Sequence, residues 1–243
     1  MVLKDFLNKI DEWDQSKIIK YNGCGGKPVT IILKFISFFG RETLWISLIA
    51  FYLLIWYDPF LLTNISATFL TGVLFIAVTK KIFNRARPFD RLGEDKVSVL
   101  ERKPKSRSFP SWHSYNITAY GLLIGVFFLN SLMFTLLMVF LAFLVSFSRI
   151  HLGVHYPTDV IIGSLLGIFG FLFSICLITP LLQVIITYFE QFALYEIEYQ
   201  KINSMLFQYI WYFILCILIF LIIFLSATYN IIKDHLKRRV SKL

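Results

Sequence analysis

The chain has 243 residues, of which 57% are hydrophobic and only 16% are charged, and its net charge is +9. This composition excludes an ordinary soluble domain, in which about 25% of the residues are charged. Several apolar stretches reach or approach the roughly 20 residues that a helix needs to cross a bilayer. The sequence therefore predicts an all-α integral membrane protein.

The positive charge is concentrated in two places. Residues 80–113 hold ten Lys or Arg against four Asp or Glu, and residues 230–243 hold five against one. Basic patches can bind nucleic acid, anionic lipid head groups or an anionic substrate. Because both patches adjoin apolar stretches, the lipid and substrate interpretations are preferred, and no nucleic-acid partner is expected. The three cysteines, Cys24, Cys176 and Cys216, show neither a metal-binding spacing nor a disulfide framework.

The N-terminal segment is predicted to lie at the membrane surface. In residues 2–19, apolar side chains recur at helical spacing with charged residues between them, which is typical of an interfacial helix. Residues 21–27 contain three glycines and are predicted to form a loop. Residues 29–39 are apolar but short and contain Lys34, which favours a second helix in the membrane plane or partly inserted. The first 28 residues lack an uninterrupted apolar core, so no cleavable signal peptide is expected.

Six membrane-spanning helices are predicted downstream, over residues 43–57, 60–79, 115–130, 132–147, 160–178 and 206–228. Asp58-Pro59 separates the first pair, because proline disfavours helix in the preceding residue, and Asn130-Ser131 forms a tight turn after the third span. Residues 183–201 are amphipathic, contain three Glu and are placed at a surface. The predicted fold class is an all-α polytopic transmembrane helical bundle, with about six spanning helices and an N-terminal interfacial helix. Its segments are the N-terminal helices and loop (1–42), the core (43–178), and the surface helix, last span and basic tail (179–243).

Three polar clusters lie at the ends of these spans. They are Lys80 with Arg87-Pro88 after the second span, Pro110-Ser111-Trp112-His113 before the third, and Ser148-Arg149, His155 and Asp159 between the fourth and fifth. Because the third and fourth spans form a hairpin, all three clusters are expected to emerge on one membrane face and to form one site.

Two pairs of glycines, Gly121/Gly125 and Gly163/Gly167, lie in the helices that follow His113 and His155. Glycines at this spacing let helix backbones approach closely. Close contact between these two helices would bring the imidazoles together, and ordinary packing without catalytic purpose is an equal alternative.

The cations of the clusters suit a phosphate ester. Lys80, Arg87 and Arg149 can bind phosphate oxygens and neutralise their charge. Lys80 and Arg87 are seven residues apart, so one helix face would present both if the helix continued. Taken singly, each cation is better explained as a charge that faces water or lipid head groups at a span end.

The two histidines add acid–base and nucleophilic groups. His113 can protonate a leaving alkoxide and then activate water, and the neighbouring Ser111 can donate a hydrogen bond to a phosphate oxygen. Pro157 favours a helix start just after His155, where free N–H groups attract phosphate. Asp159 would hold the Nδ1 proton of His155 and leave Nε2 as the nucleophile. The alternatives are a polar interfacial anchor for His113 and a helix-start carboxylate for Asp159.

A metal site is disfavoured. His151, His155 and Asp159 repeat every fourth residue, as they would on a metal-binding helix face. However, Gly153 and Pro157 interrupt any continuous helix, and the nearby cations would repel a divalent ion. No metal or other cofactor is expected, and His151 is interpreted as a residue at the rim of the site.

The three clusters resemble the signature of the type 2 phosphatidic acid phosphatase superfamily of integral membrane lipid phosphatases, K-x6-R-P, P-S-G-H and S-R-x5-H-x3-D. The resemblance covers roughly residues 40–178, and the first and third elements match completely. It implies that His155 is the nucleophile and forms a phosphohistidine, that Asp159 orients it, and that His113 acts as general acid and then base. It also implies a phosphate-binding set of Lys80, Arg87, Ser111, Trp112 and Arg149, without metal or cofactor.

One position departs from the signature, because Trp112 stands where the family has glycine. The backbone N–H remains available to phosphate. The indole would narrow the site or pack on an acyl chain, and tryptophan also suits the membrane interface. The departure therefore bears on the substrate more than on catalysis.

The predicted function is hydrolysis of a phosphomonoester or pyrophosphate on a membrane lipid, with phosphatidate, phosphatidylglycerophosphate, polyprenyl diphosphate and lipid A phosphates as open substrates. The alternatives are a lipid phosphotransferase that uses the same intermediate, and a non-enzymatic anion transporter or lipid-binding scaffold. The partners are the bilayer and the lipid phosphate, and the sequence specifies no oligomeric state.

The resemblance implies a bacterial inner (plasma) membrane protein with its site facing the periplasm or exterior. The basic tail 233–242 instead favours a cytoplasmic C-terminus by the positive-inside rule. With six spans, both cannot hold. The outward site is preferred, because substrate-binding cations distort the charge count.

Overall fold

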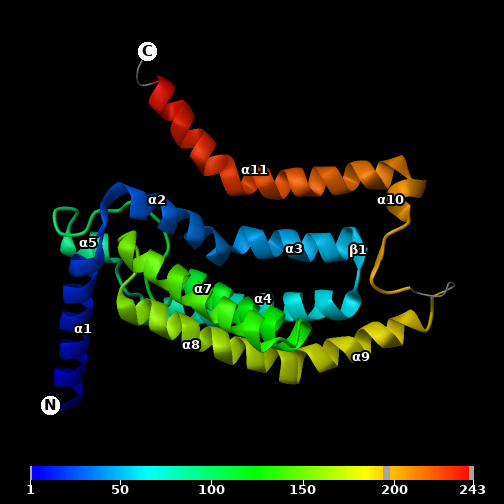
Figure 1. The fold of residues 1–243 in the computed structure, drawn as a ribbon, viewed down its shortest axis with the longest axis horizontal. Coiled ribbons are helices and arrows are strands. Elements are labelled where there is room, and N and C mark those ends of the chain that lie inside the picture. Colours follow the sequence, from blue (N-terminus) through cyan, green and yellow to red (C-terminus); the bar gives the residue numbers. More distant parts are fainter. Residues whose placement is uncertain (1, 194–197, 241–243) are drawn as a thin grey trace. The chain divides into compact units, whose positions relative to one another are not determined.

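The computed structural model describes residues 2–193 and 198–240, and most of this chain is helical (Figure 1). The chain forms two compact units. Unit 1 comprises Met1–Arg41 and Ala67–Pro180, and unit 2 comprises Glu42–Ser66 and Leu181–Leu243. All eight predicted site residues lie in unit 1.

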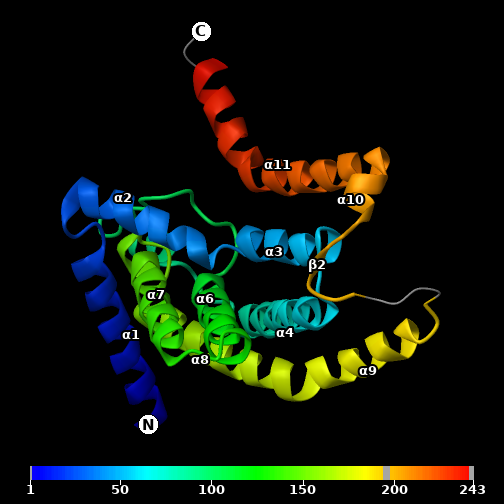
Figure 2. The same cartoon turned by 45° about the vertical axis from the view of Figure 1, so that its right-hand side comes forward.

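Unit 1 is built from helices α1, α2 and α4 to α8 and three short segments. These are α1 (Val2–Tyr21), α2 (Gly26–Ser37), η1 (Phe38–Gly40), most of α4 (Pro59–Phe83), α5 (Pro88–Leu92), α6 (Trp112–Leu122), the π-helical η2 (Leu123–Phe128), α7 (Leu132–His151), α8 (Pro157–Phe173) and the π-helical η3 (Ser174–Ile178). Helix α6 packs against both α7 and α8, and α2 runs along α7 (Figure 2).

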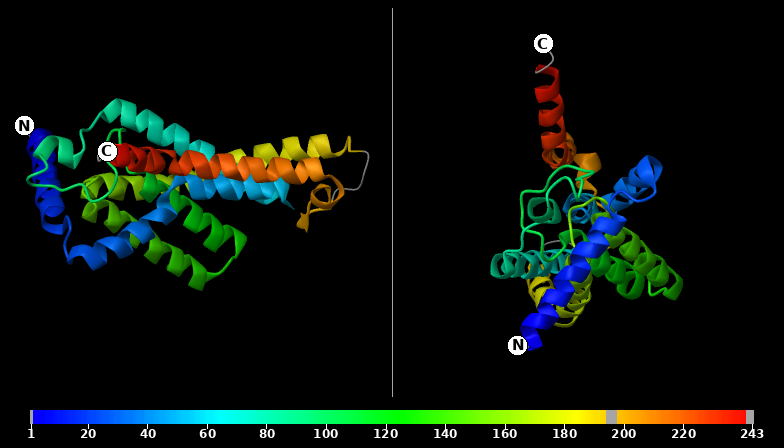
Figure 3. Two further views of the ribbon diagram at one scale, coloured as in Figure 1. Left: turned by 90° about the horizontal axis from the view of Figure 1, so that it is seen from above. Right: turned by 90° about the vertical axis from the view of Figure 1, so that its left-hand side faces the viewer.

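Unit 2 contains α3 (Glu42–Leu54), β1 (Trp56–Tyr57), β2 (Lys201–Ile202), α10 (Met205–Gln208) and α11 (Ile210–Val240). It also contains the first residues of α4 and most of α9 (Thr179–Glu190). Helix α11 packs along α3 (Figure 3), and the two short strands pair antiparallel with Trp56 opposite Ile202.

The prediction of a helical membrane protein is confirmed. Among the described residues, four helical stretches are long and apolar enough to cross a membrane, namely Pro59–Leu92, Leu132–His151, Pro157–Glu190 and Ile210–Tyr229. Helix α3 is apolar but has only 13 residues. The total of six spans and the interfacial position of α1 therefore stay predictions.

Two predicted helix boundaries differ from the structure. Helix α4 ends at Phe83, four residues beyond the predicted span, so it does not continue from Lys80 to Arg87 and the condition for a shared helix face is not met. Asn84 has a φ of 44°, in the left-handed region that asparagine tolerates at the end of a helix. The amphipathic segment predicted over 183–201 is also shorter, since its helix ends at Glu190, and part of it lies outside the described residues.

The glycine pairs explain the close packing of α6. A Cβ atom at Gly163 would lie 2.5 Å from the Ser111 carbonyl oxygen, and one at Gly167 would lie 2.8 Å from the Tyr115 carbonyl oxygen. Only glycine permits these contacts between α8 and α6. The other pair faces a different neighbour, because Gly121 and Gly125 pack against α7. Contact between α6 and α8 therefore depends on one glycine pair rather than on both.

Candidate active site

The first and third clusters meet at Arg87, whose side chain is buried in the segment between α4 and α5. Its Nη1 donates a hydrogen bond to the Val154 carbonyl oxygen at 2.7 Å and lies 3.3 Å from His155 Nε2. Its Nε donates to the Ser106 carbonyl oxygen at 2.7 Å. A guanidinium fixed in this way stands directly beside the nitrogen that the sequence assigns as the nucleophile.

The second cluster joins the third through the backbone. The Ser111 N–H donates to the Asp159 carbonyl oxygen at 2.9 Å. The buried Ser111 hydroxyl caps α6, because it accepts from the Ser114 N–H at 3.3 Å and from the Ser114 hydroxyl at 3.0 Å. The start of α6 is therefore anchored on the first turn of α8, and the Ser111 hydroxyl serves the helix N-terminus in this structure.

The Trp112 indole packs on aromatic neighbours. It stacks on the Tyr115 ring with centroids 5.5 Å apart and planes 2° apart. It also meets Phe69 of α4 edge-on at 6.0 Å. These contacts give the side chain a packing partner within unit 1, while its backbone N–H lies in the first turn of α6.

His113 lies in the same electrostatic field as the third cluster. Desolvation lowers the pKa of His113 well below its usual value, and the positive charges of Arg149, Arg41 and Arg87 lower it further, as does His155 when its ring is protonated. Of these groups, only Arg41 was not predicted from the sequence as part of the site. His113 is thus within electrostatic range of Arg149, Arg87 and His155.

His155 lies in the turn between α7 and α8 and is almost fully buried. Its Nδ1 is 3.5 Å from Asp159 Oδ2, which is longer than a typical N–H···O hydrogen bond. Burial lowers the pKa of His155 well below its usual value, and the charges of Arg87, Arg149 and Lys80 lower it further, while the Ser108 backbone offsets part of this effect. At neutral pH the imidazole is therefore uncharged, as a nucleophile must be.

The activity should therefore have an acid limb that lies below pH 6.5. Protonation of His155 blocks attack, and its lowered pKa keeps the ring neutral as the pH falls. Removing a positive charge favours the imidazolium, so Lys80→Met should raise the pKa and move the limb to higher pH. The profile of kcat/KM against pH for the two proteins on one substrate checks this shift, since the ionisation of the substrate is common to both. A limb that stays in place would contradict it.

Asp159 is fully buried and held by three donors. Its Oδ1 accepts from Arg85 Nη1 at 2.8 Å. Its Oδ2 accepts from the Tyr156 N–H at 2.8 Å and from the Ser108 hydroxyl. The carboxylate therefore acts at the start of α8, as the alternative interpretation of this residue expects, and it also lies beside the imidazole.

Arg149 is paired with a carboxylate that the sequence analysis missed. Its Nη2 donates to Glu101 Oε1 at 2.5 Å, and its Nη1 donates to Glu101 Oε2 at 3.1 Å and to the Ser37 hydroxyl at 2.6 Å. A bidentate carboxylate is also the geometry in which arginine binds phosphate. The only sequence signal for Glu101 is that it is one of four acidic residues in the strongly basic segment 80–113.

Glu101 should compete with phosphate for Arg149. Glu101→Gln removes the competing charge, so inorganic phosphate should inhibit the variant roughly 10-fold more strongly, equivalent to about 1.4 kcal/mol. The inhibition constant for phosphate measures this effect. Glu94→Gln is the matched control, because this residue pairs with Lys103 on the exposed side of the same segment. Weaker inhibition would show instead that Glu101 holds Arg149 in place for the substrate.

Two further predicted residues have defined contacts. Lys80 is half-buried, and its Nζ donates to the Arg107 carbonyl oxygen at 2.5 Å. His151 is fully buried and is not at the rim of the site. Its Nε2 lies 2.9 Å from the Thr30 hydroxyl, so it ties α7 to α2. The rim interpretation is wrong because a polar partner on α2, far away in sequence, accommodates the imidazole.

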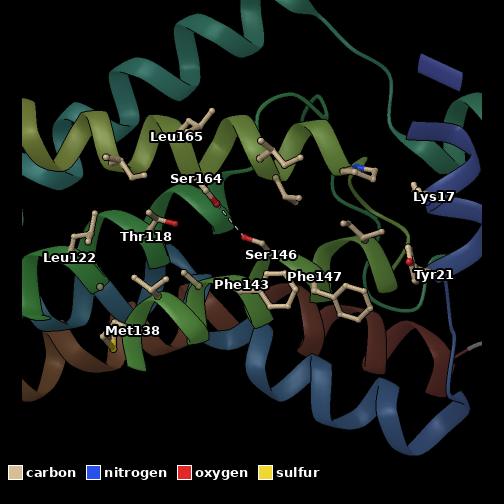
Figure 4. Close-up of a pocket in the computed structure, with 18 of the residues that line it drawn as sticks. Lys17, Tyr21, Thr118, Leu122, Met138, Phe143, Ser146, Phe147, Ser164 and Leu165 are labelled. Carbon is tan, nitrogen blue, oxygen red and sulfur yellow. Dashed lines mark hydrogen bonds between the residues drawn. The ribbon is translucent and has the colours of Figure 1, made fainter. Parts of the chain in front are cut away.

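A separate groove of about 800 Å³ lies among α1, α6, α7 and α8 (Figure 4). Its walls are mainly apolar, with Phe143 and Leu165 among them, and Lys17 lies at one end. The hydroxyls of Ser146 and Ser164 meet across it at 3.4 Å. None of the eight predicted site residues lines it, so the groove is distinct from the phosphate site.

Comparison with known proteins agrees with this geometry. The profile of the PAP2 superfamily matches residues 56–182, more than half of the chain. An undecaprenyl-diphosphatase from Sulfolobus acidocaldarius is 30% identical over 151 residues, which cover 62% of this chain and 70% of that protein. A decaprenylphosphoryl-5-phosphoribose phosphatase from Mycobacterium tuberculosis is 38% identical over 88 residues, covering 36% of this chain and 45% of that protein.

The fold is also similar to a solved structure. The crystal structure of Aquifex aeolicus LpxE superposes with a TM-score of 0.56 at 21% identity, covering 65% of this chain and 92% of that protein. The matched segment of the family profile contains all eight predicted site residues. The chain therefore belongs to the PAP2 superfamily, as its three motifs predict, and is by class a lipid phosphate phosphatase.

Proposed function

We propose that this protein hydrolyses the terminal phosphate of a polyprenyl diphosphate or polyprenyl phosphate in the membrane, without a metal, through a phosphohistidine on His155. The observation that carries the mechanism is the 3.3 Å contact between Arg87 Nη1 and His155 Nε2. A phosphate bound to this guanidinium would lie next to the attacking nitrogen. The similarity to the undecaprenyl-diphosphatase supports the choice of lipid.

In the first step the Nε2 lone pair of His155 attacks phosphorus, and the bond from phosphorus to the leaving oxygen breaks. His113 gives a proton to that oxygen as it leaves. The ring of His155 then carries a positive charge beside the Asp159 carboxylate. Arg87, Arg149 and Lys80 neutralise the equatorial oxygens, where charge develops in phosphoryl transfer.

In the second step a water molecule loses a proton to His113 and attacks the phosphohistidine. The bond between Nε2 and phosphorus breaks, and inorganic phosphate leaves. Both steps need a cluster of cations that binds phosphate and two histidines on opposite sides of it. The proposed membrane orientation places this site on the outer face, where the lipid head group is presented from the bilayer.

The test is phosphate release by the purified full chain in detergent. The panel contains a polyprenyl diphosphate, a polyprenyl monophosphate, phosphatidate and phosphatidylglycerophosphate, each with and without EDTA. We expect EDTA-resistant release that is fastest from a polyprenyl substrate and is blocked by vanadate. Release from a glycerolipid alone would refute the choice of lipid. Transfer of the phosphorus to a second lipid, with no free phosphate, would identify a phosphotransferase instead.

A further inference from the structure

Helix α1 sends one fully buried carboxylate, Asp14, towards the site. Asp14 Oδ2 forms a salt bridge with Arg85 Nη2 at 2.6 Å. Its Oδ1 accepts from the Thr158 N–H at 2.9 Å, and its Oδ2 accepts from the Thr158 hydroxyl. The end of α1 that follows Asp14 lies by α5 in Figure 1, so three segments far apart in sequence meet around this carboxylate.

Arg85 connects Asp14 with the carboxylate beside His155. Its Nη1 donates to Asp159 Oδ1 at 2.8 Å, while its Nη2 binds Asp14. The guanidinium also lies over the Tyr156 ring, 4.1 Å from the centroid, which favours a cation at this place. One guanidinium thus bridges two carboxylates, and both carboxylates are fully buried.

The charges of this group do not cancel. Asp14 and Asp159 with Arg85 carry a net charge of −1, while the nearby Asp11, 3.7 Å from Arg85 Nη2, is paired with Arg91. Lys80 and Arg87 offset part of the negative charge of Asp159, and a negative charge left in a buried environment favours a positive charge beside it. Asp159 Oδ2 lies 3.5 Å from His155 Nδ1. In the proposed mechanism the His155 ring becomes positive when Nε2 bonds to phosphorus, and this positive charge balances the group. The other charges that act on the ring, those of Lys80, Arg87 and Arg149, are positive and oppose a cationic ring, so Asp159 is the counter-charge that the structure places beside it.

We infer that Asp14 is a positioning residue for catalysis, which neutralises Arg85 so that the charge of Asp159 is available to His155. The inference rests on the proposed function, because it requires a cationic ring on His155. Without Asp14, Arg85 would pair with Asp159 alone, and the ring would lose its counter-charge. Helix α1 then contributes to catalysis through the contact of Asp14 with Arg85.

A purely structural role for Asp14 makes a different prediction. If Asp14 only held α1 against α8 through Thr158, then removing the contacts of Arg85 as well would reduce activity further. If Asp14 neutralises Arg85, then removal of the Arg85 charge should compensate for removal of the Asp14 charge. The double variant Asp14→Asn/Arg85→Met separates the two roles.

We expect Asp14→Asn to lower kcat about 10- to 100-fold, by analogy with carboxylates that orient metal-binding histidines, with little change in KM. The double variant should recover most of this loss. Glu12→Gln is the matched control, because it removes an exposed carboxylate of the same helix. A double variant no more active than Asp14→Asn would overturn the inference.

Binding of vanadate gives a readout that does not need turnover. Vanadate bonded to Nε2 makes the His155 ring cationic, whereas inorganic phosphate leaves it neutral. Titration calorimetry should therefore show vanadate bound more weakly by Asp14→Asn and phosphate bound as by the wild type. If Asp14→Asn weakened the binding of vanadate and of phosphate equally, or changed neither, the inference would be overturned. A wild-type protein that binds phosphate but not vanadate would instead overturn the proposed nucleophile.

Discussion

Replacing His155 with glutamine should abolish phosphate release, lowering kcat by roughly 10⁴-fold or more, as loss of a catalytic nucleophile does. The glutamine amide has a similar reach and its oxygen can still accept a hydrogen bond from Arg87, but its nitrogen lone pair is delocalised into the carbonyl group and is not nucleophilic. Steady-state release from the best substrate of the panel measures the loss. Acid-labile, base-stable phosphate on the wild-type protein, absent from the variant, would identify the phosphohistidine.

The control for this variant is His151→Gln. His151 is the last residue of α7, four residues before His155, is also buried, and contacts Thr30 of α2 rather than the cation cluster. We expect this variant to lose stability and to keep turnover per folded molecule. If His155→Gln retained wild-type turnover, the assignment of the nucleophile would be refuted. If His151→Gln alone lost turnover per folded molecule, the active histidine would be misassigned.

The convergence of the three clusters could be predicted from the sequence because it depends on helix topology. Each cluster lies at the end of an apolar stretch, and a tight turn at Asn130-Ser131 forces the third and fourth helices into a hairpin. The structure confirms this arrangement by the contact of Arg87 with His155 and of Ser111 with Asp159. The contact of α6 with α8 was also foreseeable, since Gly163 and Gly167 leave room for the α6 backbone.

The ionic partners in the site could not be predicted, because each depends on a residue far away in the chain. In the sequence, Asp14 is one of several charged residues of the predicted interfacial helix, and nothing distinguishes it from the others. It is buried because Arg85 and Thr158, 71 and 144 residues away, supply donors to it. Glu101 likewise lies in an irregular segment, where no periodicity indicates the direction of a side chain.

Lys80 and Arg87 do not share a helix face, and the cause is local. The shared helix face for Lys80 and Arg87 assumed that α4 continues through residue 87. Asn84 adopts a left-handed conformation and the helix ends at Phe83. The two cations are nevertheless close, since the positive charge of Arg87 acts on Lys80 and both approach the carbonyl oxygen of Arg107. The turn after Phe83, rather than a continuous helix, brings Arg87 close to Lys80.

His113→Ala should lower turnover by roughly 10²- to 10⁴-fold on a lipid monophosphate, the range for loss of a general acid–base group. Its pKa is lowered in the free protein, so the ring is neutral at neutral pH and is only a weak acid until substrate binds. A phosphate dianion bound between the two histidines would raise that pKa and load the acid. The protonated form is thus produced by the substrate that needs it.

The leaving group distinguishes acid catalysis from a packing role. An alkoxide leaves only with a proton, whereas p-nitrophenolate leaves without one. We therefore expect His113→Ala to slow phosphorylation of the enzyme far less with p-nitrophenyl phosphate than with a lipid monophosphate. The burst of p-nitrophenol gives this rate for the first substrate, and a single-turnover experiment gives it for the lipid. The loss on a diphosphate, whose leaving group is a weakly basic phosphate ester, should be as small as the loss on p-nitrophenyl phosphate. Equal losses on all three substrates would show that His113 holds the site together and does not deliver a proton.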